Sequence, residues 1–216
     1  MRLVTAIGAV VVWTASAQAG GIPSGFTSIF NGKDLSGWHV SQTNHHGTTP
    51  DWHVETGVIV GSQNPPGKGG ILLTDRKYRN FEVTLELKPD WGCDSGLFLR
   101  SNEAGQAYQV MLDYLPKGNM GGTYGERLQD VKGVNADWEP HWKKDDWNVL
   151  RARIEGDVPH IQVWLNEVQI TDWTDTANHA ADGAVDGMIA VQVHGGGRWV
   201  PGGRHRFRNL AIKELP

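Results

Sequence analysis

The feature that most constrains the fold is the strict alternation of apolar and polar residues through residues 81–88, FEVTLELK. Neighbouring side chains of a β-strand point to opposite faces, so this segment predicts a strand with one face on a core and one in solvent. The predicted core face is Phe81, Val83, Leu85 and Leu87, and the predicted solvated face is Glu82, Thr84, Glu86 and Lys88. Similar short runs are residues 52–60, 95–100, 108–114, 149–154, 160–166, 188–194 and 206–213.

Two further features support the same fold class: the high glycine content and the absence of amphipathic helix patterns between these runs. The chain has 28 Gly in 216 residues without a fixed repeat, a level typical of folds with many turns. We therefore predict an all-β fold, a two-sheet jelly-roll sandwich. Residues 116–147 lack any periodicity and are predicted to form a functional loop region over one face.

The first residues have the pattern of a secretory signal peptide. Arg2 precedes an apolar run over residues 3–13, and small residues follow up to Ala19. We predict cleavage after Ala19, which leaves residues 20–216 as a single domain that is exported to the periplasm or secreted. No later stretch approaches the roughly 18 apolar residues of a membrane span. The only cysteine, Cys93, excludes an internal disulfide.

Charge and tryptophan content narrow the range of ligands. The formal charge of −4, with Lys and Arg scattered among acids, argues against nucleic acid as a partner. The 10 Trp exceed what a core of this size needs. They are predicted to be either platforms for sugar rings or core residues whose indole N–H is hydrogen-bonded. A sugar or glycoside is the predicted ligand, and the pattern makes no prediction of oligomeric state.

Strand parity gathers polar side chains on one predicted face. With Leu97 and Leu99 on the core side of their strand, Arg100 turns to the other side. If the strands are neighbours in one sheet, the face away from the core carries Arg100, Gln109, Asp113, Gln192 and His194, joined by Arg151, Arg153, Gln162 and Trp164. An ordinary solvated face is the alternative, but such faces favour Lys, Glu and Thr. The composition therefore favours a sugar-binding face.

The motifs argue against several common catalytic sites. Retaining glucanases on jelly rolls use two carboxylates on one strand, and the Glu-x-Asp-x-Glu pattern that would supply them is absent. A Gly-x-Ser-x-Gly elbow, a phosphate-binding loop and a zinc-type cysteine cluster are absent as well. The pair His45-His46 could ligate a metal, but without a partner motif a surface position is favoured, and no metal ligands are assigned.

His194 stands out among the histidines of the chain. It ends an apolar strand and precedes Gly195-Gly196-Gly197, where the lack of side chains lets a ligand approach the backbone. An imidazole there is a candidate general base near neutral pH. Asp113 is the nearest carboxylate of the predicted face, and Arg100 is the candidate cation for a developing oxyanion.

Several segments carry a family resemblance: residues 26–38 (FTSIFNGKDLSGW), 52–59 (WHVETGVI), 95–100 (SGLFLR), 146–148 (DWN), 164–166 (WLN) and 207–210 (FRNL). In this order, over residues 25–215, they resemble the 3-keto-disaccharide hydrolase family, formerly a domain of unknown function. The resemblance implies a concanavalin A-like jelly roll. It also implies 3-keto-glucoside 1,2-lyase and 3-keto-2-hydroxyglucal hydratase activities, which together hydrolyse a glycoside.

The resemblance implies roles for the residues of the predicted face. A C3 ketone acidifies the C2 hydrogen, so one base and one enolate stabiliser can expel the C1 substituent, after which water adds. His194 or Asp113 is the implied base, and Arg100 or a bound divalent cation the implied stabiliser; no other cofactor is implied. The implied sugar-positioning residues are Gln109, Gln192 and Trp138 or Trp142.

One segment departs from the family pattern. Many members carry Glu-x-Gln on the strand that here reads Tyr108-Gln109-Val110. The loop of residues 121–126, GGTYGE, is the predicted alternative source of a carboxylate, with Glu126 and Tyr124 as candidate sugar ligands. Two other functions stay open for a jelly roll: a non-catalytic carbohydrate-binding module and a protein-contact module of the cell envelope.

Overall fold

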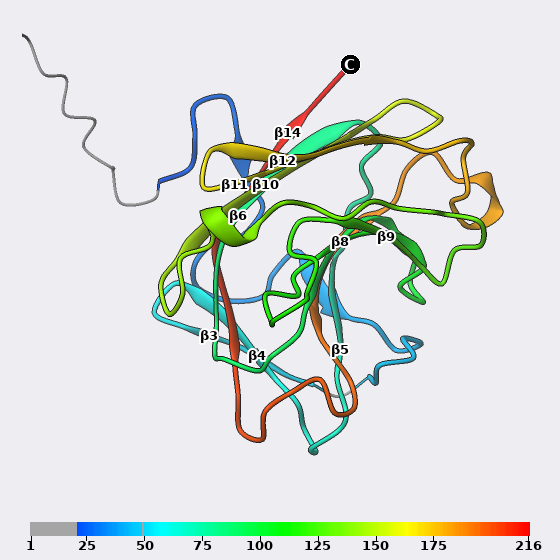
Figure 1. Cartoon of the computed structure of the whole chain (residues 1–216). Coiled ribbons are helices and arrows are strands. Elements are labelled where there is room, and N and C mark those ends of the chain that lie inside the picture. Colours follow the sequence, from blue (N-terminus) through cyan, green and yellow to red (C-terminus); the bar gives the residue numbers. More distant parts are fainter. Residues whose placement is uncertain (1–20, 49) are drawn as a thin grey trace, which may run out of the picture.

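The computed structural model describes residues 21–48 and 50–216, which form two antiparallel sheets packed face to face (Figure 1). The predicted signal peptide, residues 1–19, lies outside the described residues. The eight-stranded sheet has the order β12–β11–β10–β6–β14–β4–β3, with β1 paired to β14. The six-stranded sheet has the order β2–β5–β13–β7–β8–β9. In the described ranges no helix has the length and apolarity needed to cross a membrane.

The strands of the eight-stranded sheet are β1 (Thr27–Ser28), β3 (Asp51–Glu55), β4 (Val58–Ser62), β6 (Phe81–Pro89), β10 (Asn148–Glu155), β11 (His160–Leu165), β12 (Val168–Thr174) and β14 (His205–Glu214). Those of the six-stranded sheet are β2 (Trp38–Val40), β5 (Gly70–Thr74), β7 (Gly96–Ser101), β8 (Ala107–Met111), β9 (Thr123–Glu126) and β13 (Met188–Val193). The described ranges also contain two single-turn helices, η1 (Glu139–His141) and η2 (Ala181–Gly183).

The core lies between the two sheets, where alternate residues of each strand meet. The predicted core face of β6 is buried, and Phe81, Val83 and Leu87 have no exposed surface. It packs in one cluster with the apolar residues of the facing sheet, including Leu97, Leu99, Tyr108, Val110 and Val191. Burial of each such side chain contributes about 1.5–3 kcal/mol. The predicted all-β sandwich of two sheets is therefore confirmed.

The other face of β6 differs from the prediction of a solvated face. Glu82, Thr84 and Glu86 are only 7%, 4% and 4% exposed. β6 lies between β10 and β14, and an arginine side chain from each of these two strands covers its glutamates. Arg151 Nη1 donates to Glu82 Oε2 at 2.9 Å, and Arg208 Nε donates to Glu86 Oε2 at 2.7 Å. The prediction was wrong for these three residues because parity does not show what covers a face.

The predicted polar face is divided between the two sheets. β7, β8 and β13 are neighbours in the six-stranded sheet, as the prediction required. β10 and β11 belong to the eight-stranded sheet, so Arg151, Arg153, Gln162 and Trp164 lie on the other side of the sandwich from Gln192. Arg151 there stacks over the Trp164 ring at 3.7 Å. Parity tells which way a side chain points but does not assign its strand to a sheet.

His205 of β14 is a buried histidine whose two ring nitrogens have no hydrogen-bond partner among the described residues. Its ring stacks on Phe207 at a centroid distance of 4.6 Å. Burial lowers the pKa of His205 from 6.5 to about 3. Below pH 6.5 the unfolded chain binds a proton at this histidine, whereas the folded chain does not until about pH 3. In that range the free energy of unfolding therefore falls by about 1.4 kcal/mol for each pH unit of acidification.

We expect His205→Leu to lose less stability in acid than the wild-type protein. Between pH 7.5 and pH 4.5 the change in unfolding free energy should be smaller by about 2–3 kcal/mol, because leucine has no proton to bind in the unfolded state. Urea unfolding at both pH values measures this difference. As a control, His160→Leu alters a partly exposed histidine paired with Asp172. An equal decrease in unfolding free energy between the two pH values in the wild-type protein and His205→Leu would contradict the prediction.

Candidate functional site

The six-stranded sheet carries a pocket of about 220 Å³ on the face turned away from the core. Three strands and the adjoining loops line it: Gln109 and Met111 of β8, Tyr124 and Glu126 of β9, Gln192 of β13, and His46, Asp94, Ser95, His194 and Arg198 of the loops. Five predicted site residues lie in this lining: Gln109, Tyr124, Glu126, Gln192 and His194. The pocket thus joins segments that are far apart in the sequence.

Two buried amides form the floor of the pocket. Gln109 Nε2 donates to Gln192 Oε1 at 3.3 Å across β7, which lies between their strands. The β7 residue below them is Gly96, where a Cβ would come within 1.9 Å of Gln109 Nε2. Glycine is therefore needed at this position for the amide pair to form. The second polar groups of both amides can bind hydroxyl groups of a ligand.

His194 has a defined tautomer in this arrangement. Its Nδ1 lies 2.6 Å from the carbonyl oxygen of Gly195, which can only accept a hydrogen bond. In the neutral ring, Nδ1 therefore carries the hydrogen and Nε2 keeps its lone pair. That Nε2 lies 4.0 Å from Asp94 Oδ2. A neutral imidazole with a free lone pair beside a carboxylate is an arrangement suited to a general base.

Arg198 bridges two buried carboxylates at the edge of the pocket. Its Nε donates to Asp94 Oδ2 and its Nη2 donates to Asp113 Oδ2. Both aspartates are 6% exposed. Burial and the charge of Asp113 raise the pKa of Asp94, which Arg198 and His194 partly oppose. Asp113 thus faces Arg198 rather than the pocket floor.

Arg100 does not lie in the pocket, although parity predicted it there. Its guanidinium donates to the backbone oxygens of Arg79 at 2.7 Å and Gly156 at 2.9 Å, and to Asn80 Oδ1 at 3.0 Å. The β7–β13 register shifts next to Arg100, whose φ is 53°. Such an irregularity breaks the alternation of side chains along a strand. Arg198 is the cation that this site contains instead.

The two predicted platform tryptophans pack elsewhere. Trp138 is 6% exposed, and its indole Nε1 donates to the backbone oxygen of Gly118 at 3.1 Å. Trp142 stacks on Tyr114 with ring centroids 5.3 Å apart. Both join the core cluster, so the segment of residues 116–147 contributes to the pocket through β9 instead. The core interpretation holds in full for Trp138; Trp142 also packs against the core, but its indole Nε1 has no hydrogen-bond partner among the described residues.

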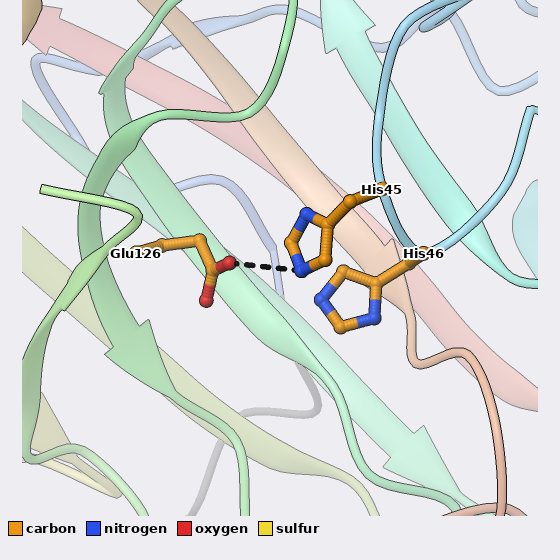
Figure 2. Close-up of side chains that lie close together, drawn as sticks. All are labelled: His45, His46 and Glu126. Carbon is orange, nitrogen blue, oxygen red and sulfur yellow. Dashed lines mark ion pairs between the residues drawn. The ribbon is translucent and has the colours of Figure 1, made fainter.

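Of the two loop histidines, His46 lines the pocket and His45 is exposed beside it. Figure 2 shows His45 facing Glu126, with Nε2 3.3 Å from Oε1, and His46 alongside. The rings of His45 and His46 are 4.0 Å apart, and the His46 ring meets His194 edge-on at 4.5 Å. Burial lowers the pKa of His46 to about 3 and raises the pKa of Glu126. The surface position predicted from the sequence holds for His45, which is exposed, and is wrong for His46, because the β2–β3 loop folds over the sheet and places His46 in the pocket lining.

These three side chains are also a candidate cation site. One donor atom of each lies within 4.8 Å of the others. The Gly195 N–H donates to His46 Nδ1 at 3.2 Å, so the hydrogen of the neutral His46 ring is on Nε2. A nitrogen that carries hydrogen cannot ligate a metal, and binding through it would require a proton shift that breaks the Gly195 bond. The set therefore fits a hydrogen-bonding role better than a cation.

Five lining residues were absent from the predicted site: His46, Asp94, Ser95, Met111 and Arg198. Asp94 has the same parity as Gly96 and could have been added from the alternation alone. Arg198 follows the glycine run that drew attention to His194. His46 gives no such signal, because it reaches the pocket through a loop. A Cβ on Gly195 would lie 2.6 Å from His46 O, so glycine lets these two loops meet.

Comparisons with known proteins agree with this architecture. A 3-keto-disaccharide hydrolase from Bacteroides thetaiotaomicron is 24% identical over 240 residues, which cover 88% of this chain and 79% of that protein. A proposed glycosyl hydrolase from Parabacteroides distasonis superposes with a TM-score of 0.61 at 21% identity, covering 89% of this chain and 94% of that one. The carbohydrate binding module CBM66 from Bacillus subtilis superposes with a TM-score of 0.56 at 13% identity, covering 82% of this chain and 96% of that one. The solved structures share the predicted jelly-roll sandwich.

The family assignment rests on the match to a family model. Residues 25–213 match the model of the 3-keto-alpha-glucoside-1,2-lyase-like domain. This range includes both sheets apart from the last residue of β14, and it includes every residue that lines the pocket. The resemblance seen in the sequence motifs is therefore confirmed: the chain belongs to the 3-keto-alpha-glucoside-1,2-lyase-like domain family.

Proposed function

We propose that this protein cleaves 3-keto-glucosides by elimination followed by hydration, with the reaction taking place in the 220 Å³ pocket. The observation that carries the proposal is the His194 Nε2 lone pair, held beside Asp94 in a pocket that also contains a buried carboxylate, Glu126. Membership of a carbohydrate-active family gives the substrate class. The volume and the polar lining suit one sugar ring.

The proposed reaction has two stages. A base removes the C2 proton, and the electron pair forms an enolate between C2 and the C3 oxygen. The enolate then re-forms the ketone as the C1–O bond breaks, and the leaving oxygen takes up a proton to give the free aglycone and a 3-keto-2-hydroxyglucal. Water then adds its oxygen to C1 and a proton returns to C2. The sum is hydrolysis of the glycoside.

His194 is the proposed base of the first stage. Its Nδ1–H is held by Gly195 O, so Nε2 is directed to accept a proton. Asp94, 4.0 Å away, would stabilise the imidazolium that forms. Asp113, the alternative base, is engaged by Arg198 at the edge of the pocket. In this proposal Arg198 is a positioning residue that holds Asp94 next to the base.

The neighbouring loop and strand supply the remaining roles. His46 Nε2–H is buried without a hydrogen-bond partner among the described residues, so it is the proposed donor to the C3 oxygen of the enolate. Burial raises the pKa of Glu126, which favours its protonated form and suits it to protonate the leaving oxygen. Gln109, Gln192 and Tyr124 are the proposed contacts to the sugar hydroxyls.

The test of this proposal is turnover of a 3-keto-glucoside by the purified protein, followed by NMR. We expect release of the aglycone and transient signals of the 2-hydroxyglucal. Prior dialysis against a chelator should leave the rate unchanged, because the hydrogen on His46 Nε2 opposes cation binding by that cluster.

Two other outcomes would count against parts of this account. Loss of the rate on chelation, with recovery on adding a divalent cation, would contradict the role given to His46. Broadening of the substrate signals without release would contradict catalysis and favour a non-catalytic binding module. Matched samples of the 3-hydroxyl glucoside serve as the control, because its C2 hydrogen is not acidified by a ketone.

A further inference from the structure

His46 is held at the pocket by hydrogen bonds from three segments of the chain. Its backbone oxygen accepts from Gly69 N at 2.8 Å, and its ring Nδ1 accepts from Gly195 N at 3.2 Å. Its backbone N–H donates to Asn44 Oδ1 at 3.0 Å. Gly69 and Gly195 contribute backbone groups, whereas Asn44 contributes its side chain. The Asn44 contact is therefore the one of these three that a substitution removes directly.

Asn44 is a buried residue of the β2–β3 loop, and both polar atoms of its amide are hydrogen-bonded. It is 4% exposed. While Oδ1 accepts from His46 N, Nδ2 donates to the backbone oxygen of Ala104 at 3.1 Å. A backbone N–H only donates and a carbonyl oxygen only accepts, so these two partners fix which end of the amide is oxygen. Ala104 belongs to the β7–β8 turn, and the amide thus ties that turn to a residue of the pocket lining.

The β7–β8 turn is shaped to receive this amide. Gly105 has a φ of +80°, and a Cβ there would lie 2.3 Å from Asn44 Nδ2. Glycine therefore serves both the backbone conformation and the space that the amide needs. Glu103 of the same turn fastens the start of the loop, because its backbone oxygen accepts from Ser41 Oγ at 2.7 Å and its Oε1 accepts from Gln42 N at 3.1 Å. The β2–β3 loop is thus anchored at its start and at Asn44.

We infer that Asn44 is a positioning residue of the reaction: it fixes His46 and thereby directs the His46 Nε2–H toward the C3 oxygen of the enolate. The inference rests on the proposed function, which gives His46 the role of donor to that oxygen. Asn44 is not among the residues that line the pocket, so it acts through His46. A donor stabilises a developing oxyanion only where it already stands at hydrogen-bond distance, so a loop free to move loses most of that contribution.

The test is a double-mutant cycle of Asn44→Ala and His46→Ala, measured as steady-state rates on a 3-keto-glucoside. We expect Asn44→Ala to lower kcat about tenfold with KM nearly unchanged, since the enolate charge develops in the transition state. His46→Ala should lower kcat about 10²-fold, and the double variant should be no slower than His46→Ala. Gln42→Ala is the matched control. It alters an exposed side chain of the same loop, which donates to Val40 O at 3.0 Å, and should keep the wild-type rate.

A second readout follows His46 without turnover. Burial lowers the pKa of its ring to about 3, so the ¹⁵N signals of the ring should show a neutral imidazole from pH 5 to pH 8 in the wild-type protein. In Asn44→Ala the loosened loop exposes the ring to solvent. The pKa of His46 should then rise toward 6.5, and the ring should become protonated at pH 5. Absence of the signals from the spectrum of His46→Ala identifies them.

The outcomes separate this inference from the proposed function. An additive loss in the double variant, or a His46 ring that stays neutral at pH 5 in Asn44→Ala, would overturn the inference while leaving the reaction in place. If the wild-type protein cleaves no 3-keto-glucoside, the proposed function fails, and the ring titration alone decides whether Asn44 holds His46. Asn44→Ser keeps an acceptor for His46 N–H but gives up the bond to Ala104 O, so both readouts should change less. It replaces Asn44→Ala if circular dichroism shows that the alanine variant does not fold.

Discussion

Replacing His194 with alanine is expected to lower kcat/KM on a 3-keto-glucoside by about 10³-fold, within the range of about 10²–10⁴ that a positioned general base contributes. The Nε2 lone pair of His194 is available in the pocket, because the other ring nitrogen, Nδ1, donates its hydrogen to the Gly195 carbonyl oxygen at 2.6 Å. Alanine removes that base without adding a charge. Steady-state rates on a 3-keto-glucoside measure the loss, and it should appear in kcat because proton removal belongs to the chemical step.

Two further variants make the His194 result specific. Asp113→Ala removes the alternative base and should cost less than His194→Ala, since the Asp113 carboxylate is engaged by Arg198. His160→Ala, on the eight-stranded sheet, should keep the wild-type rate and serves as the control. Added imidazole should partly restore His194→Ala. A His194→Ala protein with wild-type turnover would rule out the proposed base, and a larger loss in Asp113→Ala would transfer the role to that carboxylate.

The fold could be predicted from the sequence because alternation is a local property of each strand. Residues 81–88 show it without an exception, and the structure buries all four of the apolar side chains between the sheets. Pairing between strands is not local. The sequence therefore did not predict that β10 lies beside β6, where Arg151 covers Glu82. Burial of the polar face of β6 follows from that pairing.

The candidate site was predictable where it depends on parity and unpredictable where it depends on loops. Gln109 and Gln192 lie on β8 and β13, the two strands that flank β7, and they meet over Gly96. Arg100 misses the pocket because the β7–β13 register shifts beside it. His46 and Arg198 reach the pocket from loops, whose paths have no periodic signal. The sequence around the tryptophans likewise gives no pattern that distinguishes the buried Trp138 from the exposed Trp91.

Arg198→Met is the second substitution with a large expected effect, about a 10²-fold loss of kcat/KM. Arg198 is the positive side chain that bridges Asp94 and Asp113, and it positions Asp94 next to the proposed base. Methionine keeps the length of the side chain but cannot donate to either carboxylate. Rates on a 3-keto-glucoside measure the loss. Arg198→Lys should recover only part of it, because an ammonium group lacks the planar fork that reaches two carboxylates at once.

The same substitution should make stability depend on pH, which separates electrostatics from simple loss of packing. Without the guanidinium, burial and the Asp113 charge raise the pKa of Asp94 further above its ordinary value of 3.8. A raised folded-state pKa contributes stability in acid that is lost as pH rises, so Arg198→Met should be destabilised more at pH 7.5 than at pH 4.5. Arg204→Met, which alters an exposed arginine paired with Glu55, is the control. Equal destabilisation at both pH values would show that the two aspartates do not interact as described.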